Sequence, residues 1–102
     1  MTEKTRNSKK AQSNPKSALG GVKVLELCRM VAGPYCVKLM ADLGAEVIKI
    51  EPPSCGDTAR RSPPFFNDIP DSEGSGLFLY LNTNKLGITL DVTTTTGRNV
   101  FL

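Results

Sequence analysis

Residues 22–51 carry two kinds of hydrophobic pattern, and together they predict a strand, a helix and a second strand. Lys23–Leu27 and Glu46–Ile50 are short runs dominated by aliphatic side chains and free of turn residues, which is typical of buried strands. The segment between them repeats its apolar side chains at helical spacing, while Lys38 and Asp42 fall on the opposite side. The helix face that we expect to lie on the sheet consists of Cys36, Leu39, Met40 and Leu43.

Both ends of this helix are marked in the sequence. Pro34 follows Gly33 and suits the first helical position, because its fixed φ is already helical. Gly44 follows Leu43, where a left-handed residue commonly ends a helix. Two strands joined by a helical crossover pair in parallel, so the stretch predicts a βαβ unit and an α/β fold.

The chain changes character after the second strand. The 25 residues from Pro52 to Gly76 include five prolines and three glycines, which predicts a long irregular loop. We expect Phe65 and Phe66 to pin this loop to the domain. Because long loops inside compact domains usually serve binding, a role near a ligand is expected.

Three further segments complete the chain. Leu77–Leu81 lacks alternation and fits either a buried strand or one or two helical turns. Ile88–Val92 is predicted to be a third strand. A threonine among residues 93–96 can cap a last helix, which is still running at Leu102. Because no stop signal follows, we expect a truncated piece of a larger domain.

The net charge of +3 is unevenly distributed along the chain. Residues 1–18 contain five Lys or Arg and one acid, a balance of +4, whereas residues 19–102 contain eight basic and nine acidic residues, a balance of −1. The first segment is polar, so we expect a disordered basic leader before one domain over residues 19–102. It lacks the apolar core of a secretory signal, the pattern of a mitochondrial presequence and aromatic residues that stack on bases. No membrane span is expected anywhere in the sequence.

Residue types that are common in catalytic sites are scarce. The chain has no histidine, which removes the usual general base and the commonest metal ligand. Cys28, Cys36 and Cys55 are odd in number and lack CxxC spacing, which argues against disulfides and a zinc site and favours a reducing cytoplasm. We expect Cys36 in the core and Cys28 packed at a strand end. No metal site is predicted.

Parallel pairing would bring Cys28–Gly33 and Glu51–Gly56 together at the carboxyl ends of the strands, where open α/β sheets bind ligands. Ala32 and Gly33 are small. They either let a ligand approach the helix N-terminus or allow tight packing of helix on strand, and the residues leave both interpretations open. A dinucleotide site is disfavoured, because this turn has one glycine in place of G-x-G-x-x-G. Glu51 is therefore expected to bond backbone groups or an arginine.

A series of motifs then gives a family resemblance. GVKVLELCRMVAGPYCVKLMADLGAEVIKIE resembles the opening of the family III CoA-transferases, which include formyl-CoA transferase, carnitine CoA-transferase and α-methylacyl-CoA racemase. The resemblance covers Leu19–Leu102 and continues through Gly56-Asp57-x-x-Arg60, Pro63-Pro64-Phe65, Asn82-x-Asn84-Lys85, Leu90-Asp91 and Thr96-Gly97. It implies the N-terminal part of a large α/β domain with a Rossmann-like parallel sheet, an interlocked homodimer and CoA thioesters as substrates.

The resemblance also implies which residues contact coenzyme A. It places the CoA-contacting turn after the first strand, and it places Pro52 and Leu90 beside the adenine. Val31 stands where formyl-CoA transferase has an amide side chain, which disfavours an oxalate-type substrate. Pro52 stands where several members carry an arginine, so a nucleotide contact is expected from Arg60 or Lys85. The predicted CoA-binding residues are Met30, Val31, Ala32, Gly33, Pro52, Arg60, Lys85 and Leu90.

By this resemblance the protein is expected to move CoA between an acyl-CoA thioester and a carboxylic acid in the cytoplasm, without a metal or redox cofactor. The family's nucleophilic aspartate would lie beyond Leu102, so no catalytic residue is predicted here and the 102 residues alone are expected to be inactive. Three alternatives stay open. They are a racemase that abstracts the proton α to the thioester carbonyl, a non-catalytic nucleotide-binding module, and a nucleic-acid-binding protein led by its basic tail.

Overall fold

A computed structural model describes residues 17–102, so most of the predicted disordered leader (residues 1–16) lies outside the described residues. Strands, α-helices and two short 3-10 helices (η) alternate along the rest of the chain. In order they are β1 (Lys23–Glu26), α2 (Ala32–Asp42), β2 (Glu46–Glu51), η1 (Thr58–Arg61), η2 (Phe66–Asp68), α3 (Gly76–Leu81), β3 (Leu86–Thr89) and α4 (Thr95–Phe101).

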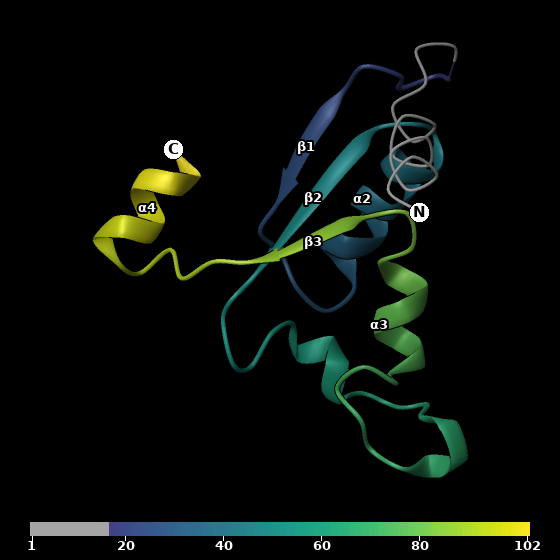
Figure 1. The fold of residues 1–102 in the computed structure, drawn as a ribbon. Helices are drawn as coiled ribbons and strands as arrows, with labels where there is room; N and C mark the ends of the chain where they lie inside the picture. Colours follow the sequence, from purple (N-terminus) through teal and green to yellow (C-terminus); the bar gives the residue numbers. More distant parts are fainter. Residues whose placement is uncertain (1–16) are drawn as a thin grey trace, which may run out of the picture.

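The three strands form a parallel sheet with β2 in the centre (Figure 1). Val24 of β1 lies opposite Val47 of β2, and Ile50 of β2 lies opposite Ile88 of β3. Helix α2 connects the first two strands, so the predicted βαβ unit and the α/β fold with a parallel sheet are confirmed.

The predicted buried face of α2 is wrong for three of its four residues, whereas Met40 packs against the core as expected. Leu39 and Leu43 are 45% and 51% exposed and Cys36 is exposed, whereas Pro34 and Ala41 are buried. The buried stripe begins where Gly33 meets Cys28 at the end of β1, and it continues through Pro34, Val37 and Ala41. Small side chains let the helix lie close to the sheet, and the resulting core contains Ala41, Ala45 and Val47 with Leu19, Val24, Val37 and Met40 packed against it.

The ends of α2 agree partly with the prediction. The helix begins at Ala32, so Pro34 is its third residue and not its first. Gly44 has φ 106°, the left-handed conformation expected after the last helical turn, and its N–H donates to the Ala41 carbonyl at 3.0 Å.

Strand β3 begins two residues before the predicted Ile88–Val92 and ends three residues before it. The Leu90 N–H still donates to the Glu51 carbonyl at 3.0 Å, but the chain then turns at Asp91, whose Oδ1 accepts the Thr93 N–H at 3.0 Å. This side-chain bond competes with continued strand pairing and ends β3. The ambiguous Leu77–Leu81 segment is helical (α3), and the predicted threonine cap is Thr94, whose Oγ1 accepts the Gly97 N–H at 2.9 Å.

The long loop after β2 is held mainly by polar groups. Ser75 is buried, and its hydroxyl lies 2.8 Å from the Ala59 carbonyl and 2.6 Å from the Ser62 carbonyl. Phe65 is half-buried and forms an isolated antiparallel β-bridge with Ser75. Phe66 is 83% exposed, so the prediction that both phenylalanines pin the loop is wrong for Phe66.

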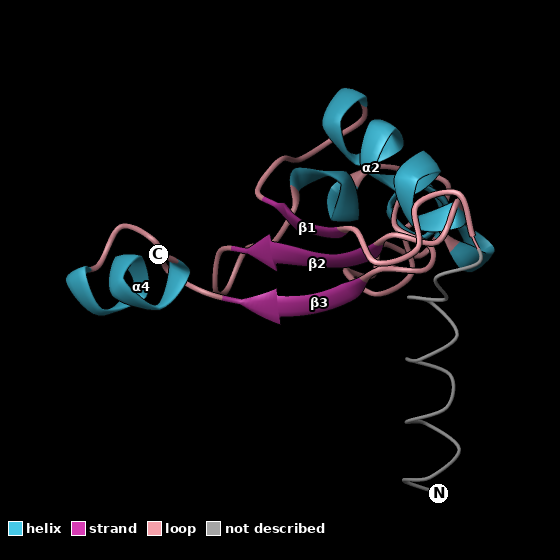
Figure 2. Cartoon of the chain, turned by 90° about the horizontal axis from the view of Figure 1, so that it is seen from above, coloured by secondary structure: helices cyan, strands magenta, loops and turns pink. Residues whose placement is uncertain are grey.

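The two faces of the sheet are covered differently. Figure 2 shows α2 on one side of the sheet and α4 set apart beyond the strand ends. Val47 contributes to the core under α2, so its neighbour Ile48 and the register partner Leu25 point to the other face. On that face Leu25, Leu27 and Ile88 are exposed. Among residues 17–102, no helix combines the length and the apolar character needed to cross a membrane.

Candidate functional site

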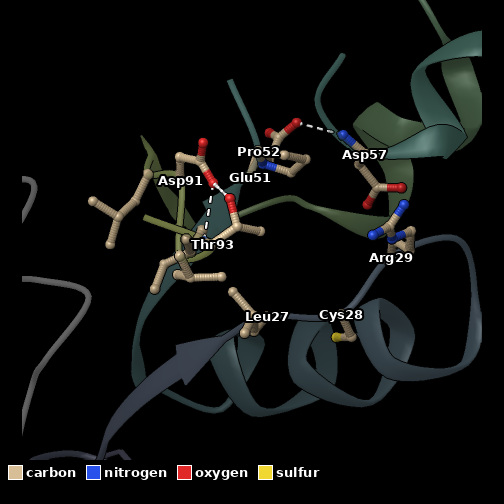
Figure 3. Close-up of a pocket in the computed structure, with 11 residues that line it drawn as sticks. Leu27, Cys28, Arg29, Glu51, Pro52, Asp57, Asp91 and Thr93 are labelled. Carbon is tan, nitrogen blue, oxygen red and sulfur yellow. Dashed lines mark hydrogen bonds between the residues drawn. The ribbon is translucent and has the colours of Figure 1, made fainter. Parts of the chain in front are cut away.

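The carboxyl ends of all three strands meet at one cavity of about 240 Å³ (Figure 3). Its walls are largely apolar and include Leu27, Ile50, Pro52, Leu90 and Val92. Its polar lining comes from Cys28, Arg29, Glu51, Asp57, Asp91 and Thr93. Since open parallel sheets bind ligands at this edge, the cavity is the first candidate site.

The turn between β1 and α2 lies beside this cavity. Met30 has φ 68°, a left-handed conformation that is uncommon for a residue with a long side chain. Met30, Val31 and Ala32 are exposed, and Val31 is the residue that precedes the helix. No side chain of the described residues caps the N-terminus of α2. The first N–H groups of α2 therefore lack a side-chain partner among the described residues, and Ala32 beside them is exposed.

Gly33 serves helix packing. A Cβ at this position would overlap the Cβ and Sγ atoms of Cys28. Of the two interpretations left open by the sequence, the structure supports tight packing for Gly33, whereas the exposed Ala32 stays available to a ligand.

Lys49 forms buried ion pairs with Asp57 and with Glu26 next to this turn. Lys49 Nζ is 2.9 Å from Asp57 Oδ2 and 3.0 Å from Glu26 Oε1, and all three side chains are at most 3% exposed. Lys49 also donates to the Cys28 carbonyl at 3.2 Å, and Asp57 Oδ1 accepts the Met30 N–H at 3.0 Å. The ion pair of Lys49 and Asp57 thus contacts the backbone on both sides of Arg29.

A second buried cation shares the same acid. Lys85 Nζ lies 2.8 Å from Glu26 Oε2, and it donates to the Pro34 carbonyl at 3.0 Å and to Asn82 Oδ1 at 2.8 Å. Lys85 therefore ties the segment after α3 to the first turn of α2.

Glu51 and Arg60 form a two-pronged pair at the end of β2. Arg60 Nε donates to Oε2 and Nη2 to Oε1, both at 2.8 Å, and Oε2 also accepts the Asp57 N–H at 2.8 Å. The guanidinium lies 3.8 Å from the centre of the Phe78 ring. The prediction that Glu51 bonds to backbone groups or to an arginine is confirmed, since it does both.

These contacts shift the pKa values of the buried groups. The hydrogen bonds from Arg60 hold the pKa of Glu51 below its ordinary value. Burial favours neutral Asp57, but the N–H of Ala59 and the Lys49 ammonium outweigh it, and the pKa of Asp57 is lowered. Burial also disfavours charged Lys49, yet its bonds to Asp57 and Glu26 raise its pKa. The network is therefore ionised at neutral pH at these three positions.

For two further groups near the network, burial is the largest cause of the pKa shift. Burial lowers the pKa of Lys85, an effect that its bond to Glu26 opposes. Burial and the hydrogen bond to Glu26 raise the pKa of the Cys28 thiol, so this cysteine is a poor nucleophile at neutral pH. Cys36 and Cys55 are exposed free thiols, and the described residues contain no cluster of His, Cys, Asp or Glu that could hold a metal.

The structure brings some of the predicted CoA-binding residues together. Pro52 and Leu90 line the same cavity, and the turn of Met30, Val31, Ala32 and Gly33 adjoins it. Arg60 and Lys85 do not line it; both are ion-paired with carboxylates and border a separate smaller cavity.

Sequence reasoning did not find Glu26, Lys49 or Asp57. A usable signal was present, because Glu26 and Lys49 are charged residues that each stand between two aliphatic residues near a strand end. In the parallel register they are direct partners. Opposite charges at matched positions of neighbouring buried strands indicate a buried ion pair.

Residues 19–102 match the model of CoA-transferase family III. Among curated proteins, a succinyl-CoA:mesaconate CoA-transferase of Haloarcula hispanica is 42% identical over 85 residues, which is 83% of this chain and 21% of that protein. A formyl-CoA:oxalate CoA-transferase of Escherichia coli is 43% identical over 82 residues, covering 80% of this chain and 19% of the relative. The chain thus spans about a fifth of the length of these relatives.

Solved structures give the same result. A CaiB/BaiF family protein from Brucella suis superposes with a TM-score of 0.71 at 39% identity, covering 83% of this chain and 22% of that one. A hypothetical protein from Mycobacterium tuberculosis superposes with a TM-score of 0.70 at 38% identity, covering 86% and 22%.

Proposed function

Because this chain belongs to CoA-transferase family III, we propose that the protein moves coenzyme A from an acyl-CoA thioester to a carboxylic acid. The observation that carries the proposal is the strand-end edge, where an uncapped helix N-terminus lies beside a cavity with apolar walls. A CoA thioester combines a polar carbonyl with a large nucleotide, so it needs both features. The similarity to transferases acting with mesaconate, glutarate and oxalate supports a carboxylic acid acceptor.

The turn of Met30 to Gly33 is proposed to hold the thioester arm. Exposed Ala32 leaves room for the chain of the ligand, and the N–H groups at the start of α2, which no side chain of the described residues caps, are proposed to donate to the carbonyl oxygen. Negative charge develops on that oxygen when a nucleophile attacks the thioester. Backbone donors and the positive end of the helix dipole stabilise such charge.

The cavity is proposed to receive the nucleotide end of CoA. Pro52 and Leu90 offer flat apolar contact to an adenine ring. Arg29 is the cationic residue of this lining, and among residues 17–102 it takes part in no ion pair within 4.0 Å. Arg60 and Lys85 were predicted to contact the nucleotide, but their charges are already matched by Glu51 and Glu26. Arg29 is therefore proposed as the phosphate contact.

The nucleophile is proposed to be an aspartate outside residues 1–102. The buried acids Glu26, Glu51 and Asp57 are each bound to a cation. In the proposed reaction, a free carboxylate attacks the thioester carbonyl and expels the CoA thiolate, which gives a mixed anhydride. The thiolate then attacks the enzyme's acyl carbon, releasing the donor acid and leaving an enzyme-bound CoA thioester. The acceptor carboxylate attacks that thioester, expels the CoA thiolate and forms a second mixed anhydride with the enzyme. The thiolate then attacks the acceptor's acyl carbon, which gives the new acyl-CoA and releases the enzyme carboxylate.

This chemistry needs no metal or redox cofactor. The family resemblance supports a homodimer. The free cysteines support a location in the reducing cytoplasm. The exposed aliphatic residues of the second sheet face are consistent with further parts of the protein packing there.

A transfer assay tests the proposal. The full-length protein is incubated with succinyl-CoA or formyl-CoA and with mesaconate, glutarate or oxalate, and the acyl-CoA products are separated and weighed by mass spectrometry. We expect a new acyl-CoA whose acyl group comes from the acid. Residues 1–102 alone are the control and should give none. Absence of any new acyl-CoA, together with exchange of the α-proton of a 2-methylacyl-CoA in D2O, would contradict transfer and favour the racemase alternative.

A further inference from the structure

We propose that Asp57 is a positioning residue for the acyl-CoA-binding turn, because its carboxylate holds the left-handed backbone of Met30 through the Met30 N–H. This inference rests on the proposed function of the turn and adds a residue that does not itself contact the thioester. Asp57 comes from the loop after β2, 27 residues away along the chain.

The backbone of Met30 is in a conformation that needs support. Its φ of 68° is a conformation that residues with a Cβ rarely adopt, so the surroundings must supply a compensating contact. That contact is the hydrogen bond from the Met30 N–H to Asp57 Oδ1 at 3.0 Å. Met30 is the last residue before Val31 and the start of α2, so its φ sets the direction in which the turn presents its next N–H groups.

Asp57 itself cannot move. Its side chain is 1% exposed, Oδ1 also accepts the Ala59 N–H at 2.9 Å, and Oδ2 is 2.9 Å from Lys49 Nζ. Its own N–H is held by Glu51. The carboxylate is therefore fixed by the central strand and by η1 together.

One ion pair clamps the turn from both sides. Lys49 holds the Cys28 carbonyl, and Asp57 holds the Met30 N–H. In the sequence, Arg29 lies between these two points, and it is one of the residues that line the cavity (Figure 3). Pairing of Lys49 with Asp57 thus connects the conformation of the turn to the position of the proposed phosphate contact.

Three variants of the full-length enzyme separate positioning from stability. Asp57→Ser keeps a hydroxyl that can cap η1 through the Ala59 N–H, but it is too short to reach Met30 as well. Asp57→Ser/Met30→Gly adds a residue that adopts positive φ without help. Asp71→Ser is the matched control, since Asp71 makes a similar local bond to the Glu73 N–H in the same loop, at an exposed place.

The readouts are kcat and KM for acyl-CoA, with the melting temperature measured on the same samples. We expect Asp57→Ser to lower kcat/KM at least tenfold with most of the protein folded at the assay temperature. The Met30→Gly substitution should restore part of that loss, and Asp71→Ser should behave as wild type.

Two results would overturn the positioning role. One is an Asp57→Ser enzyme with wild-type kcat/KM. The other is a loss that follows the unfolded fraction and is not relieved by Met30→Gly, which would make Asp57 a structural residue only. A wild-type enzyme that transfers no CoA to any acid would instead overturn the proposed function and this inference with it.

Discussion

Glu51 and Arg60 are joined by two parallel hydrogen bonds of 2.8 Å at the point where the central strand ends. The pair determines where the long loop leaves the sheet, because Arg60 belongs to η1 and also donates to the Ser72 carbonyl at 2.9 Å. One guanidinium therefore connects the strand, the first turn of the loop and its return.

The first prediction concerns this connection. Arg60→Lys keeps the charge but removes the two-pronged geometry, so the free energy of unfolding should fall by about 2 kcal/mol, less than the roughly 3–5 kcal/mol for removing one partner of a buried pair outright. Arg61→Lys is the matched control in the same element, because Arg61 is exposed and its Nη1 reaches only the Cys55 carbonyl among the described contacts. Denaturant unfolding checks both. An Arg60→Lys protein as stable as the control would show that the pair does not hold the loop.

The second prediction is a loss of stability in acid. The pKa of Glu51 is held below its ordinary value of 4.5 by Arg60, so below that pH the unfolded chain binds more protons than the folded one. Stability contributed by the pair is present above pH 4.5 and is lost as the pH falls through the lower pKa of the folded state. Melting temperatures from pH 7 to pH 3 should show this decline, and Glu51→Gln should make it shallower. An equally steep decline in Glu51→Gln would assign the effect to other acids.

The third prediction tests the packing role of Gly33 in the first turn of α2. Gly33→Ala should lower the free energy of unfolding by about 1–3 kcal/mol, the usual range for overpacking, because the new methyl group meets Cys28. Gly87→Ala is the control, since a Cβ there has open space and φ is not left-handed. Equal stability of the two variants would contradict the packing role of Gly33.

The fourth prediction concerns Arg29. If its guanidinium binds a phosphate of CoA, Arg29→Ala should lower kcat/KM for acyl-CoA by about tenfold, as expected for loss of one charge-assisted hydrogen bond. The same variant should use the matching acyl-pantetheine, which lacks the nucleotide, as well as wild type does. Arg98→Ala, on exposed α4, is the control. Equal losses with both substrates would place Arg29 elsewhere in the mechanism.

The parallel fold could be predicted from the sequence because its signals are local. The aliphatic runs around Val24 and Val47, and the glycine after Leu43, each favour one structure within a few residues. The phase of α2 could not be predicted in this way. Apolar side chains occur on two sides of that helix, and the contact between Gly33 and Cys28, which selects one side, is a tertiary contact.

From topology alone, without the family resemblance that singled out Pro52 and Leu90, the candidate site was predictable only where residues are consecutive. The turn from Met30 to Gly33 follows a strand and precedes a helix, so topology alone places it at the binding edge. Asp57 lies 27 residues further on in an irregular loop, and nothing in its neighbourhood predicts a bond to the Met30 N–H. Arg60 and Lys85 looked like free cations in the sequence because their partners, Glu51 and Glu26, are brought to them only by the fold.

The most direct test of the account is the Ala32→Leu variant of the full-length enzyme, measured beside Ala18→Leu. Both alanines are exposed, but only Ala32 lies in the proposed CoA-binding turn. Because a larger side chain at Ala32 fills space that the thioester arm needs, kcat/KM for acyl-CoA should fall at least tenfold while the melting temperature stays within about 2 °C of wild type, the shift expected for an exposed substitution. Ala18→Leu should change neither quantity. An Ala32→Leu enzyme with wild-type kinetics at both saturating and subsaturating acyl-CoA would contradict the assignment of this turn to coenzyme A.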